Sequence, residues 1–555
     1  MTKKTTTRTN TPRTTTTQRE TLRNRLLRRI DWRFLLPDPA PDRTVCFSDG
    51  ILSEAVHLIS GQVDPPGEAA PETCDLAVAA DPDVDTLHRA RDVLRPGGAF
   101  YVEWHRRADP ERARRLVEAA GFEVVARYWP WPHPASTSPK CWVPLDAPGV
   151  RRFFLRTPTF SFIPGRAGIR APVLGLHRLR MLVLRAIPRP VCIVARKPPA
   201  PATTGPDARR HLPAGEPHVL PMPPRLRALI GEHWPEPDVG HPPDTFSWLL
   251  LTTGARTISK VVGLVFADAQ AAPGMVVKMP RVPEAVPALK HEAETLDAIH
   301  ASHLRPVAGV PRVLFYEQNG DVMALAETVV TGVPLWSKLR RSTYRTLALR
   351  VTDWLADFAG RTVHLPRSAW GDRLIDTTMR TFTSQFAPVL DPEKIRKTEK
   401  ALDQLDALPM VCEQRDFGPW NVLVAPDGAL GVLDWESAEL RGLPALDLIY
   451  FLSFQAFFHD RTMRSRRFRP SYRTLLDAST FTGSIHAECT ARYVDGVGIE
   501  PGLLHPLRLL CWMIHAGSDY RHLAADVAGD PCADDLRRSA FLGLWEEELA
   551  HGRRQ

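Results

Sequence analysis

The chain has 555 residues, of which 44% are hydrophobic and 24% are charged, and its formal net charge is +8. A chain of this length exceeds one ordinary core, so we expect two or three domains, and the composition excludes wholesale disorder. The basic excess is spread along the sequence. A phosphate-bearing partner explains it as well as nucleic acid does, and we predict no nucleic-acid binding.

The eight cysteines are scattered and lack the spacing of a zinc site. No apolar run reaches the roughly 18 residues that a membrane-spanning helix needs, and the N-terminus lacks the apolar core of a secretory signal. These features predict a cytoplasmic protein with reduced thiols and no transmembrane segment.

Changes in composition divide the chain into segments. Residues 1–28 start with a Thr-rich basic stretch that is nearly free of apolar side chains, which predicts a disordered basic tail. Residues 29–198 alternate helical patterns with the short apolar runs RTVCF, CDLAVAA, AFYVEW, FEVVARYW and VCIVARK, which is the rhythm of an α/β domain. Residues 199–243 are crowded with proline and are interpreted as a linker, interrupted by a short helix around 225–233.

After the linker, three runs read as strands: SWLLLTT, KVVGLVFA and MVVKMP. The turn at residues 271–274 joins the last two into a hairpin, and apolar residues at helical spacing predict a helix over 289–299. Beyond Trp336 the patterns are mainly helical. A small sheet-rich lobe followed by a larger helical lobe is therefore expected.

Several side chains in these lobes fit phosphoryl transfer from ATP, which needs a cation on the phosphates, oxygen ligands for Mg²⁺ and a carboxylate near the acceptor hydroxyl. Lys278 ends an apolar strand, and Glu292 on the next helix could hold it by an ion pair. The stretch QRDFGPWNVLV contains Asp416 and Asn421 on either side of a predicted turn, and a hairpin would return Asp434 to the same place. Taken alone, Lys278 and Glu292 are more typical of ordinary surface charges, and the D-x-x-x-x-N spacing is more typical of β-turns with solvated acids.

In this order, the lysine, the helix glutamate, the Q-R-D-F-G-P-W-N loop and the L-D-W-E strand end resemble the aminoglycoside phosphotransferase and choline kinase-like family of small-molecule kinases. The resemblance implies a two-lobed protein-kinase-like fold for residues 244–555, with an N-lobe over 244–330 and a C-lobe over 331–555. It also implies ATP and Mg²⁺ as cofactors and a small-molecule hydroxyl as the phosphate acceptor.

Site roles follow from the same resemblance. Asp416 would be the general base, and Lys278 would bind phosphate with Glu292 as its partner. Asn421 and Asp434 would hold Mg²⁺, and the backbone around Glu327 and Val329 would meet adenine.

The chain departs from the family pattern at two places. Gln414 stands where the family usually has a histidine, and the nucleotide-covering loop 252–260 has one glycine. Asp447 also matches a family aspartate and is expected to brace the helical lobe. The basic run over 461–473 falls where the family builds its acceptor pocket, which would favour an anionic acceptor, although such a run is more often a solvated loop.

The first domain resembles the second half of a class I SAM-dependent methyltransferase over residues 74–104, where a strand, a helix, a Pro-Gly-Gly turn and a strand follow one another. The cofactor half does not match, because the turn after the first strand has a single glycine, Gly50. We therefore expect a degenerate, Rossmann-like domain with a structural or docking role, and keep SAM binding as the alternative. Residues 173–189 mix leucines with arginines, which fits either peripheral membrane contact or a buried helix.

Together these patterns predict a multidomain α/β plus α+β protein, Rossmann-like at its N-terminus and kinase-like at its C-terminus. The leading function is an ATP- and Mg²⁺-dependent small-molecule phosphotransferase. A pseudokinase scaffold and a SAM-dependent methyltransferase with an accessory kinase-like domain are the alternatives.

Overall fold

The computed structural model describes residues 16–552, except 106–108, 137–139, 158–189, 200–221, 236–242, 244, 253–257, 268–269, 302–306, 319–321, 363–371, 406–407, 464 and 528–529. The segment 173–189, for which membrane contact was considered, lies outside the described residues. In the described part of the chain, no helix combines the length and the apolar character needed to cross a membrane.

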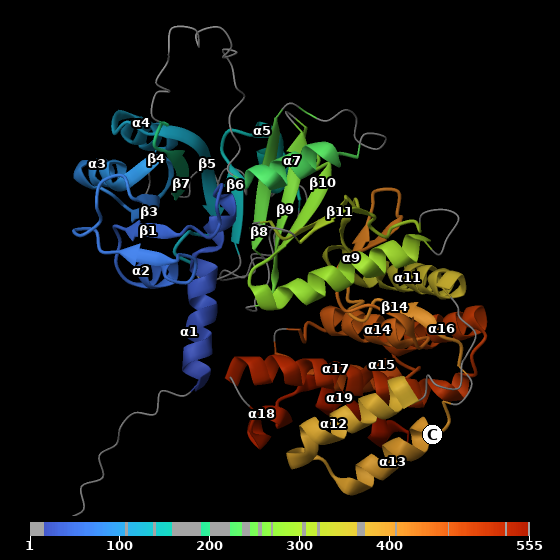
Figure 1. Cartoon of the computed structure of the whole chain (residues 1–555). Coiled ribbons are helices and arrows are strands. Elements are labelled where there is room, and N and C mark those ends of the chain that lie inside the picture. Colours follow the sequence, from blue (N-terminus) through green and yellow to red (C-terminus); the bar gives the residue numbers. More distant parts are fainter. Residues whose placement is uncertain are drawn as a thin grey trace, which may run out of the picture.

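One twelve-stranded sheet runs through both predicted domains, in the order β11-β12-β10-β9-β8-β6-β5-β7-β4-β3-β1-β2 (Figure 1). The first domain contributes β1 (Arg43–Cys46), β2 (Gln62–Asp64), β3 (Cys74–Ala80), β4 (Leu94–Trp104), β5 (Glu123–Trp131), β6 (Lys140–Pro144) and β7 (Val191–Arg196). The second contributes β8 (Phe246–Thr252), β9 (Lys260–Ala267), β10 (Met275–Pro280), β11 (Val313–Glu317) and β12 (Ala324–Thr328). The sheet is therefore shared between the two predicted domains.

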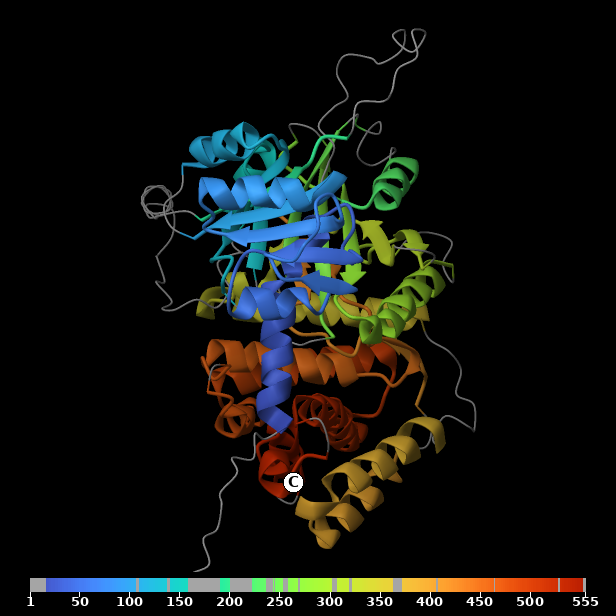
Figure 2. The same cartoon turned by 60° about the vertical axis from the view of Figure 1, so that its left-hand side comes forward.

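The first domain is an α/β layer in which β2, β1, β3 and β4 run parallel and β7, β5 and β6 follow antiparallel. Helix α2 (Ile51–Val56) covers one face, and α3 (Val84–Val93) and α4 (Pro110–Ala119) cover the other (Figure 2). Because helices cover both faces, β3 is apolar along nearly its whole length rather than alternating.

Strands β6 and β8 join the two halves of the sheet. They pair antiparallel, with Cys141 opposite Leu251 and Trp142 opposite Leu250. Helix α5 (Pro148–Arg156) packs over this junction. Trp142, Trp248 and Tyr101 all belong to one buried core that continues under both halves of the sheet.

The N-terminal segment differs from the predicted tail. Helix α1 (Thr16–Arg29) and the short 3-10 helix η1 (Asp31–Leu35) lie within or next to the range expected to be disordered, and residues 1–15 lie outside the described part. Leu27 is buried, and Trp32 stacks on Tyr101 with ring centroids 3.9 Å apart. Tertiary packing, which a Thr-rich composition does not reveal, stabilises this helix.

Part of the predicted linker is also packed. Residues 200–221 lie outside the described part, but helix α7 (Pro224–Glu232) forms where a short helix was expected. Its Leu226 and Ile230 are buried in the shared core, and Trp234 contacts the Phe246 ring at 5.5 Å. Residues 224–234 are therefore packed against the core, although they lie within a proline-rich segment.

The second domain has two lobes, and helix α9 (Val286–Ala301) lies between the small sheet β8–β12 and the helical lobe (Figure 1). The helices of the C-lobe are α10 (Leu335–Lys338), α11 (Arg341–Thr362), α12 (Thr377–Phe386), α13 (Pro392–Leu402), α14 (Leu446–His459), α15 (Phe468–Leu476), α16 (Phe481–Val497), α17 (Leu504–Val527), α18 (Ala533–Arg537) and α19 (Ala540–His551). Its strands are β13 (Val333–Pro334), β14 (Val411–Glu413), β15 (Val422–Val424), β16 (Leu430–Val432) and β17 (Glu439–Gly442).

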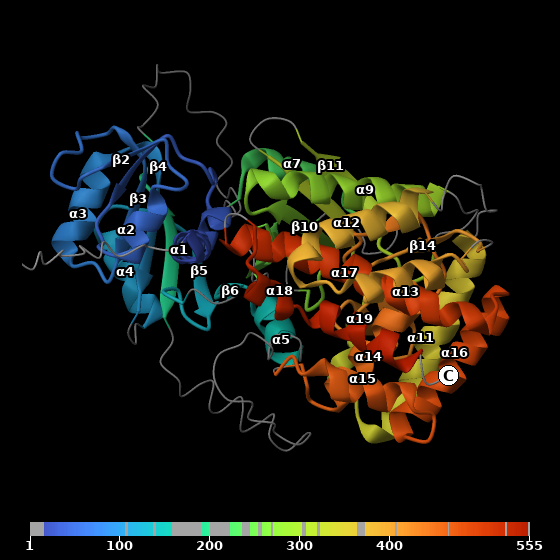
Figure 3. The same ribbon diagram turned by 90° about the horizontal axis from the view of Figure 1, so that it is seen from below.

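Helix α14 is the centre of the helical lobe. It is buried from Leu446 to Phe457, in agreement with a sequence that is apolar on all sides. Helices α11, α15, α16 and α17 contact it, whereas α12 and α13 pack on α17 (Figure 3). Buried residues from across this lobe belong to one hydrophobic core. The small sheet with α9 above a helical lobe is a protein-kinase-like arrangement, with the site residues at the junction of the lobes.

Candidate active site

Strand β10 and helix α9 bring Lys278 to two carboxylates. Its Nζ lies 2.7 Å from Glu292 Oε1 and 2.7 Å from Glu327 Oε1. All three side chains are buried. Burial alone would lower the pKa of Lys278, but the two carboxylates raise it well above its usual value. The lysine is therefore positively charged and is held in place by the two carboxylates.

The loop between β14 and β15 folds Asn421 beside Asp416. The Asn421 backbone N–H donates to Gly418 O at 2.9 Å, which closes the turn. The Asn421 side chain then donates from Nδ2 to Asp416 Oδ2, also at 2.9 Å. The sequence predicted this juxtaposition from the Gly-Pro turn.

The hairpin of β15 and β16 returns Asp434 to this loop, as expected from the PDG turn. The backbone N–H of Leu433 donates to Asn421 O at 2.9 Å, so the residue before Asp434 is tied to the loop. Asp434 itself has a positive φ of 66°, which turns the chain sharply at the end of the strand.

The carboxylate of Asp416 accepts hydrogen bonds from two aromatic side chains in addition to the Asn421 amide. Trp420 Nε1 donates to Oδ2 and the Tyr450 hydroxyl donates to Oδ1, each at 3.3 Å. Burial and the nearby Asp434 charge raise the pKa of Asp416 to about 7, although the hydrogen bonds act in the opposite direction. A carboxylate with such a pKa is suited to accept a proton near neutral pH.

Gln414 occupies the position where the family usually has histidine, and it bridges the loop and the hairpin. Its Oε1 accepts from the Asp416 backbone N–H at 2.9 Å, and its Nε2 donates to the carbonyl oxygens of Leu433 and Asp434 at 3.0 and 2.5 Å. The uncharged amide thus connects the two segments that carry the site carboxylates.

Asp447 braces the same loop from behind. Its carboxylate accepts from the backbone N–H groups of Gln414 and Arg415, at 2.7 and 2.9 Å. Burial and the charge of Glu413 raise the pKa of Asp447 to about 7. This supports the bracing role expected from the sequence.

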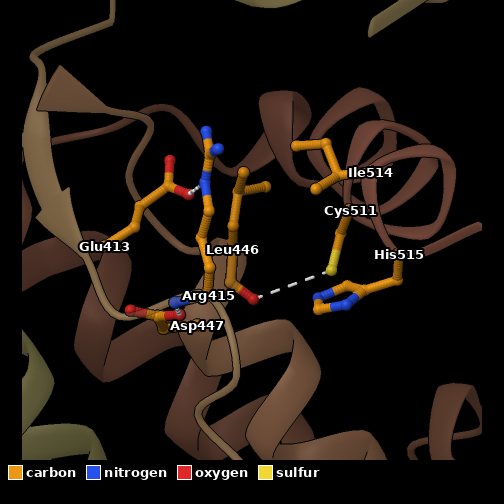
Figure 4. A pocket seen from close by; sticks show the side chains of 7 residues that line it. All are labelled: Glu413, Arg415, Leu446, Asp447, Cys511, Ile514 and His515. Carbon is orange, nitrogen blue, oxygen red and sulfur yellow. Dashed lines mark hydrogen bonds and ion pairs between the residues drawn. The ribbon is translucent and has the colours of Figure 1, made fainter. Parts of the chain in front are cut away.

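A small cavity lies beside Asp447 (Figure 4). It is lined by Glu413, Arg415, Leu446, Asp447, Cys511, Ile514 and His515. Arg415 Nε pairs with Glu413 Oε2 at 2.9 Å, so the charged groups at the cavity wall are already satisfied. The cavity belongs to the support of the loop rather than to a substrate site.

Lys260 and Glu436 are site residues that sequence reasoning missed. Lys260 Nζ lies 2.7 Å from Glu292 Oε2, 2.5 Å from Asp434 Oδ1 and 2.9 Å from Glu436 Oε2. Oxygen atoms of these three carboxylates lie within 4.8 Å of one another. Glu436 follows Asp434 in the L-D-W-E motif, which was a usable signal, whereas Lys260 was included only as the last residue of the predicted nucleotide-covering loop.

The oxygen-rich site fits a hard divalent cation. Asp434, Glu436 and Glu292 offer carboxylate oxygens, the ligand type that Mg²⁺ prefers. Asn421 uses its amide N–H on Asp416, which leaves the amide oxygen free of that hydrogen bond. Of the two predicted metal ligands, Asp434 lies with two further acids, and Asn421 is tied through its backbone oxygen to Leu433, the residue before Asp434.

The predicted adenine contacts lie at the end of β12. Glu327 is buried, and its side chain binds Lys278, a contact the sequence did not indicate. Its Oε2 has no hydrogen-bond partner among the described residues. Val329 directly follows the strand and is half-buried. Residues 253–257 of the predicted nucleotide-covering loop lie outside the described part.

The basic run 461–473 is partly neutralised. Arg473 Nε lies 2.5 Å from Glu547 Oε1, and Arg469 also pairs with a carboxylate of α19, that of Glu546. Arg466 approaches Asp519 at 3.9 Å. These three arginines therefore contact carboxylates on helices α17 and α19 of the C-lobe.

A buried lysine held by a helix glutamate, above a loop that carries an aspartate and an asparagine, defines the protein-kinase-like class of phosphotransferases. Residues 264–475 match the phosphotransferase enzyme family, APH. The resemblance predicted for the C-terminal part is thereby confirmed, and this part of the chain is a small-molecule kinase domain. A search among curated proteins finds no match.

A search among solved structures finds matches at low sequence identity. A choline/ethanolamine kinase family protein from Mesorhizobium loti is 13% identical, with a TM-score of 0.34, over 53% of this chain and 90% of that chain. An aminoglycoside phosphotransferase from Streptomyces rimosus is 20% identical, with a TM-score of 0.29, over 44% and 90%. An ethanolamine kinase from Plasmodium vivax is 10% identical, with a TM-score of 0.36, over 56% and 82%.

Proposed function

We propose that the protein transfers the γ-phosphoryl group of ATP to a hydroxyl of a small molecule, with Mg²⁺ as the required cation. The observation that carries this proposal is the hydrogen bond between Asn421 and Asp416 beside the returning strand of Asp434. It joins a candidate base to two oxygen ligands, which is the set that phosphoryl transfer needs.

In this proposal Asp416 accepts the proton of the acceptor hydroxyl, and its raised pKa of about 7 suits that task. Lys278 neutralises phosphate oxygens and is held by Glu292. Asn421 and Asp434 hold Mg²⁺, which supplies positive charge to the phosphates when bound. The backbone of Glu327 and Val329 receives adenine.

The acceptor is proposed as a small-molecule hydroxyl compound without a commitment to its charge. An anionic acceptor was expected from the run 461–473, but Arg469 and Arg473 already pair with Glu546 and Glu547. This pairing weakens the electrostatic case for an anion. A panel that contains neutral, cationic and anionic hydroxyl compounds is therefore the appropriate screen.

For the first domain we propose a Rossmann-like layer with a structural role. The order β2-β1-β3-β4 reverses at β1, and ligands of such sheets bind where the order reverses, outside the carboxyl ends of the strands. Here the Ser48 hydroxyl accepts from the Ala80 backbone N–H at 2.7 Å and bridges that crevice. This contact favours a closed structural domain over SAM binding, which titration with S-adenosylmethionine tests.

We also propose a cytoplasmic location. All eight cysteines are free thiols, and seven of them are buried. Free thiols are typical of a reducing compartment.

The central test separates the base from the metal ligand. Asp416→Asn should bind Mg-ATP and turn over about 10²- to 10⁴-fold more slowly, because a positioned base contributes that much. Asp434→Asn should lose metal-dependent nucleotide binding as well as turnover. Calorimetric titration with Mg-ATP and ATP consumption against the hydroxyl panel measure both quantities.

Asp495→Asn is the matched control, since it makes the same chemical change at an exposed position of α16. Turnover of Asp416→Asn at the rate of this control would overturn the assigned base. Binding of Mg-ATP by the unaltered protein without turnover of any acceptor would instead favour the pseudokinase alternative.

A further inference from the structure

Lys260 is buried at the point where the lobes meet. It is the first residue of β9, and in the pairing with β10 it lies opposite Pro280. The side chain is only 8% exposed. A lysine so deeply buried needs partners for its charge.

The partners of Lys260 are the carboxylates that suit a cation. Its ammonium contacts Glu292, Asp434 and Glu436 at 2.5 to 2.9 Å. The three carboxylates have oxygens within 4.8 Å of one another and therefore repel, in a site where Glu292 is buried and the side chains of Asp434 and Glu436 are 36% and 34% exposed. Of these three carboxylates Lys278 contacts only Glu292, so among the described residues Lys260 is the cation that contacts all three.

An ammonium and a divalent cation cannot share these oxygens. Mg²⁺ binds its ligands at about 2.0–2.1 Å and keeps a full octahedral shell. The ammonium already takes one hydrogen-bonding oxygen from each carboxylate. A divalent cation that coordinates Glu292 Oε2, Asp434 Oδ1 and Glu436 Oε2 therefore meets the ammonium at the same oxygens, where the two positive charges repel, and the long aliphatic stem of lysine allows it to withdraw.

We propose that Lys260 is an internal counter-ion that competes with the divalent cation for Glu292, Asp434 and Glu436. The metal site assumed here rests on the proposed function, but the competition is a separate property of the chain. In the protein alone the lysine holds the site and keeps metal affinity low. Metal binding requires that Lys260 leave the three carboxylates.

Mn²⁺ serves as the probe, because its binding to the full-length protein without nucleotide is measured by calorimetry or by its electron spin resonance signal. Lys260→Met should bind Mn²⁺ at least roughly ten-fold more tightly than the unaltered protein, because a competing charge is removed. Lys290→Met is the control. It removes an exposed lysine of α9 that pairs with Glu294 at 3.6 Å, and it should leave Mn²⁺ affinity unchanged.

A second variant shows whether the gain arises at this cluster. Adding Glu436→Gln to Lys260→Met should abolish most of the increase in affinity. Equal Mn²⁺ affinity of the unaltered protein and Lys260→Met would overturn the proposal. An increase that persists after Glu436→Gln would do so as well, because the metal would then bind elsewhere.

If Lys260→Met does not fold, labelling of the unaltered protein decides the question. An amine-reactive reagent, read by mass spectrometry, should label Lys260 more in millimolar Mn²⁺ than in its absence, while labelling of Lys290 stays constant. Unchanged labelling of Lys260 at saturating Mn²⁺ would contradict the exchange.

These results are distinguishable from the fate of the proposed function. Tighter Mn²⁺ binding by Lys260→Met without any acceptor turnover would keep the competition and remove the kinase activity. Turnover with no effect of Lys260 on metal affinity would do the reverse.

Discussion

Single residues of the site differ in how far the sequence could identify them. Asp416, Asn421 and Asp434 stand in a motif with fixed spacing, so their contacts through the loop and hairpin could be predicted. Lys260 belongs to a different strand, and its contact with Asp434 depends on strand register and on how the lobes meet. No local pattern encodes either of these, so the lysine could not be predicted.

Asp447 gives the stability of the protein a pH dependence. Its pKa of about 7 in the folded state exceeds the roughly 3.9 of an unfolded aspartate. The folded state thus binds this proton more tightly, so the group lowers the free energy of unfolding as the pH rises from about 4 to about 7. Asp447→Asn, which cannot ionise, should lack this contribution.

Thermal unfolding midpoints at several pH values between about 4.5 and about 8 check this prediction. The midpoint of Asp447→Asn relative to the unaltered protein should rise as the pH increases through this interval. Asp495→Asn, at an exposed position, should run parallel to the unaltered protein. Parallel profiles for Asp447→Asn would show that the buried carboxyl does not titrate in this range.

At the level of elements, the sequence predicted most strands but not the way they join. The runs over β1, β3, β4, β5 and β7 and those over β8, β9 and β10 were recognised from their apolar pattern. Strand β6 was not, because KCWVP is a short run without alternation. Its pairing with β8 is a contact between residues about 110 positions apart, which periodicity cannot report.

The helix η1 is fastened to the kinase sheet by a buried ion pair. Arg281 directly follows β10. Its Nε lies 2.9 Å from Asp31 Oδ1, and the side chains of Arg281 and Asp31 are 0% and 2% exposed. Removing one partner of a buried pair leaves the other charge uncompensated, which costs about 3–5 kcal/mol. Arg281→Met should therefore destabilise the protein strongly.

A nearby surface pair supplies the control. Arg23 of α1 and Glu284 lie 3.4 Å apart and are 51% and 56% exposed, so Arg23→Met should cost about 0–1 kcal/mol. Chemical denaturation of both variants measures the difference. The double variant Asp31→Asn with Arg281→Met should recover part of the loss, and a loss equal to that of Arg23→Met would contradict the assigned role of the buried pair.

For the whole molecule, one continuous sheet joins the two predicted domains through the pairing of β6 with β8. Deletion of residues 1–221 would expose the paired edge of β8 and the half of the shared core that packs against Trp142 and Trp32. Unpaired edges and large apolar faces cause aggregation. We expect residues 222–555 alone to be insoluble or to unfold at a much lower temperature.

Cutting the chain without removing any part should have a different effect. A protease site inserted within residues 200–221 leaves β6, β8 and the ion pair of Asp31 with Arg281 in place. The two fragments should then stay together in size-exclusion chromatography under native conditions and separate only in denaturant, with ATP consumption unchanged by the cut. If fragment 222–555 were soluble and had the thermal midpoint of the full chain, the shared sheet would contribute little to stability. If that fragment were insoluble while the cut chain stayed assembled, the first domain would be shown to complete the fold of the second.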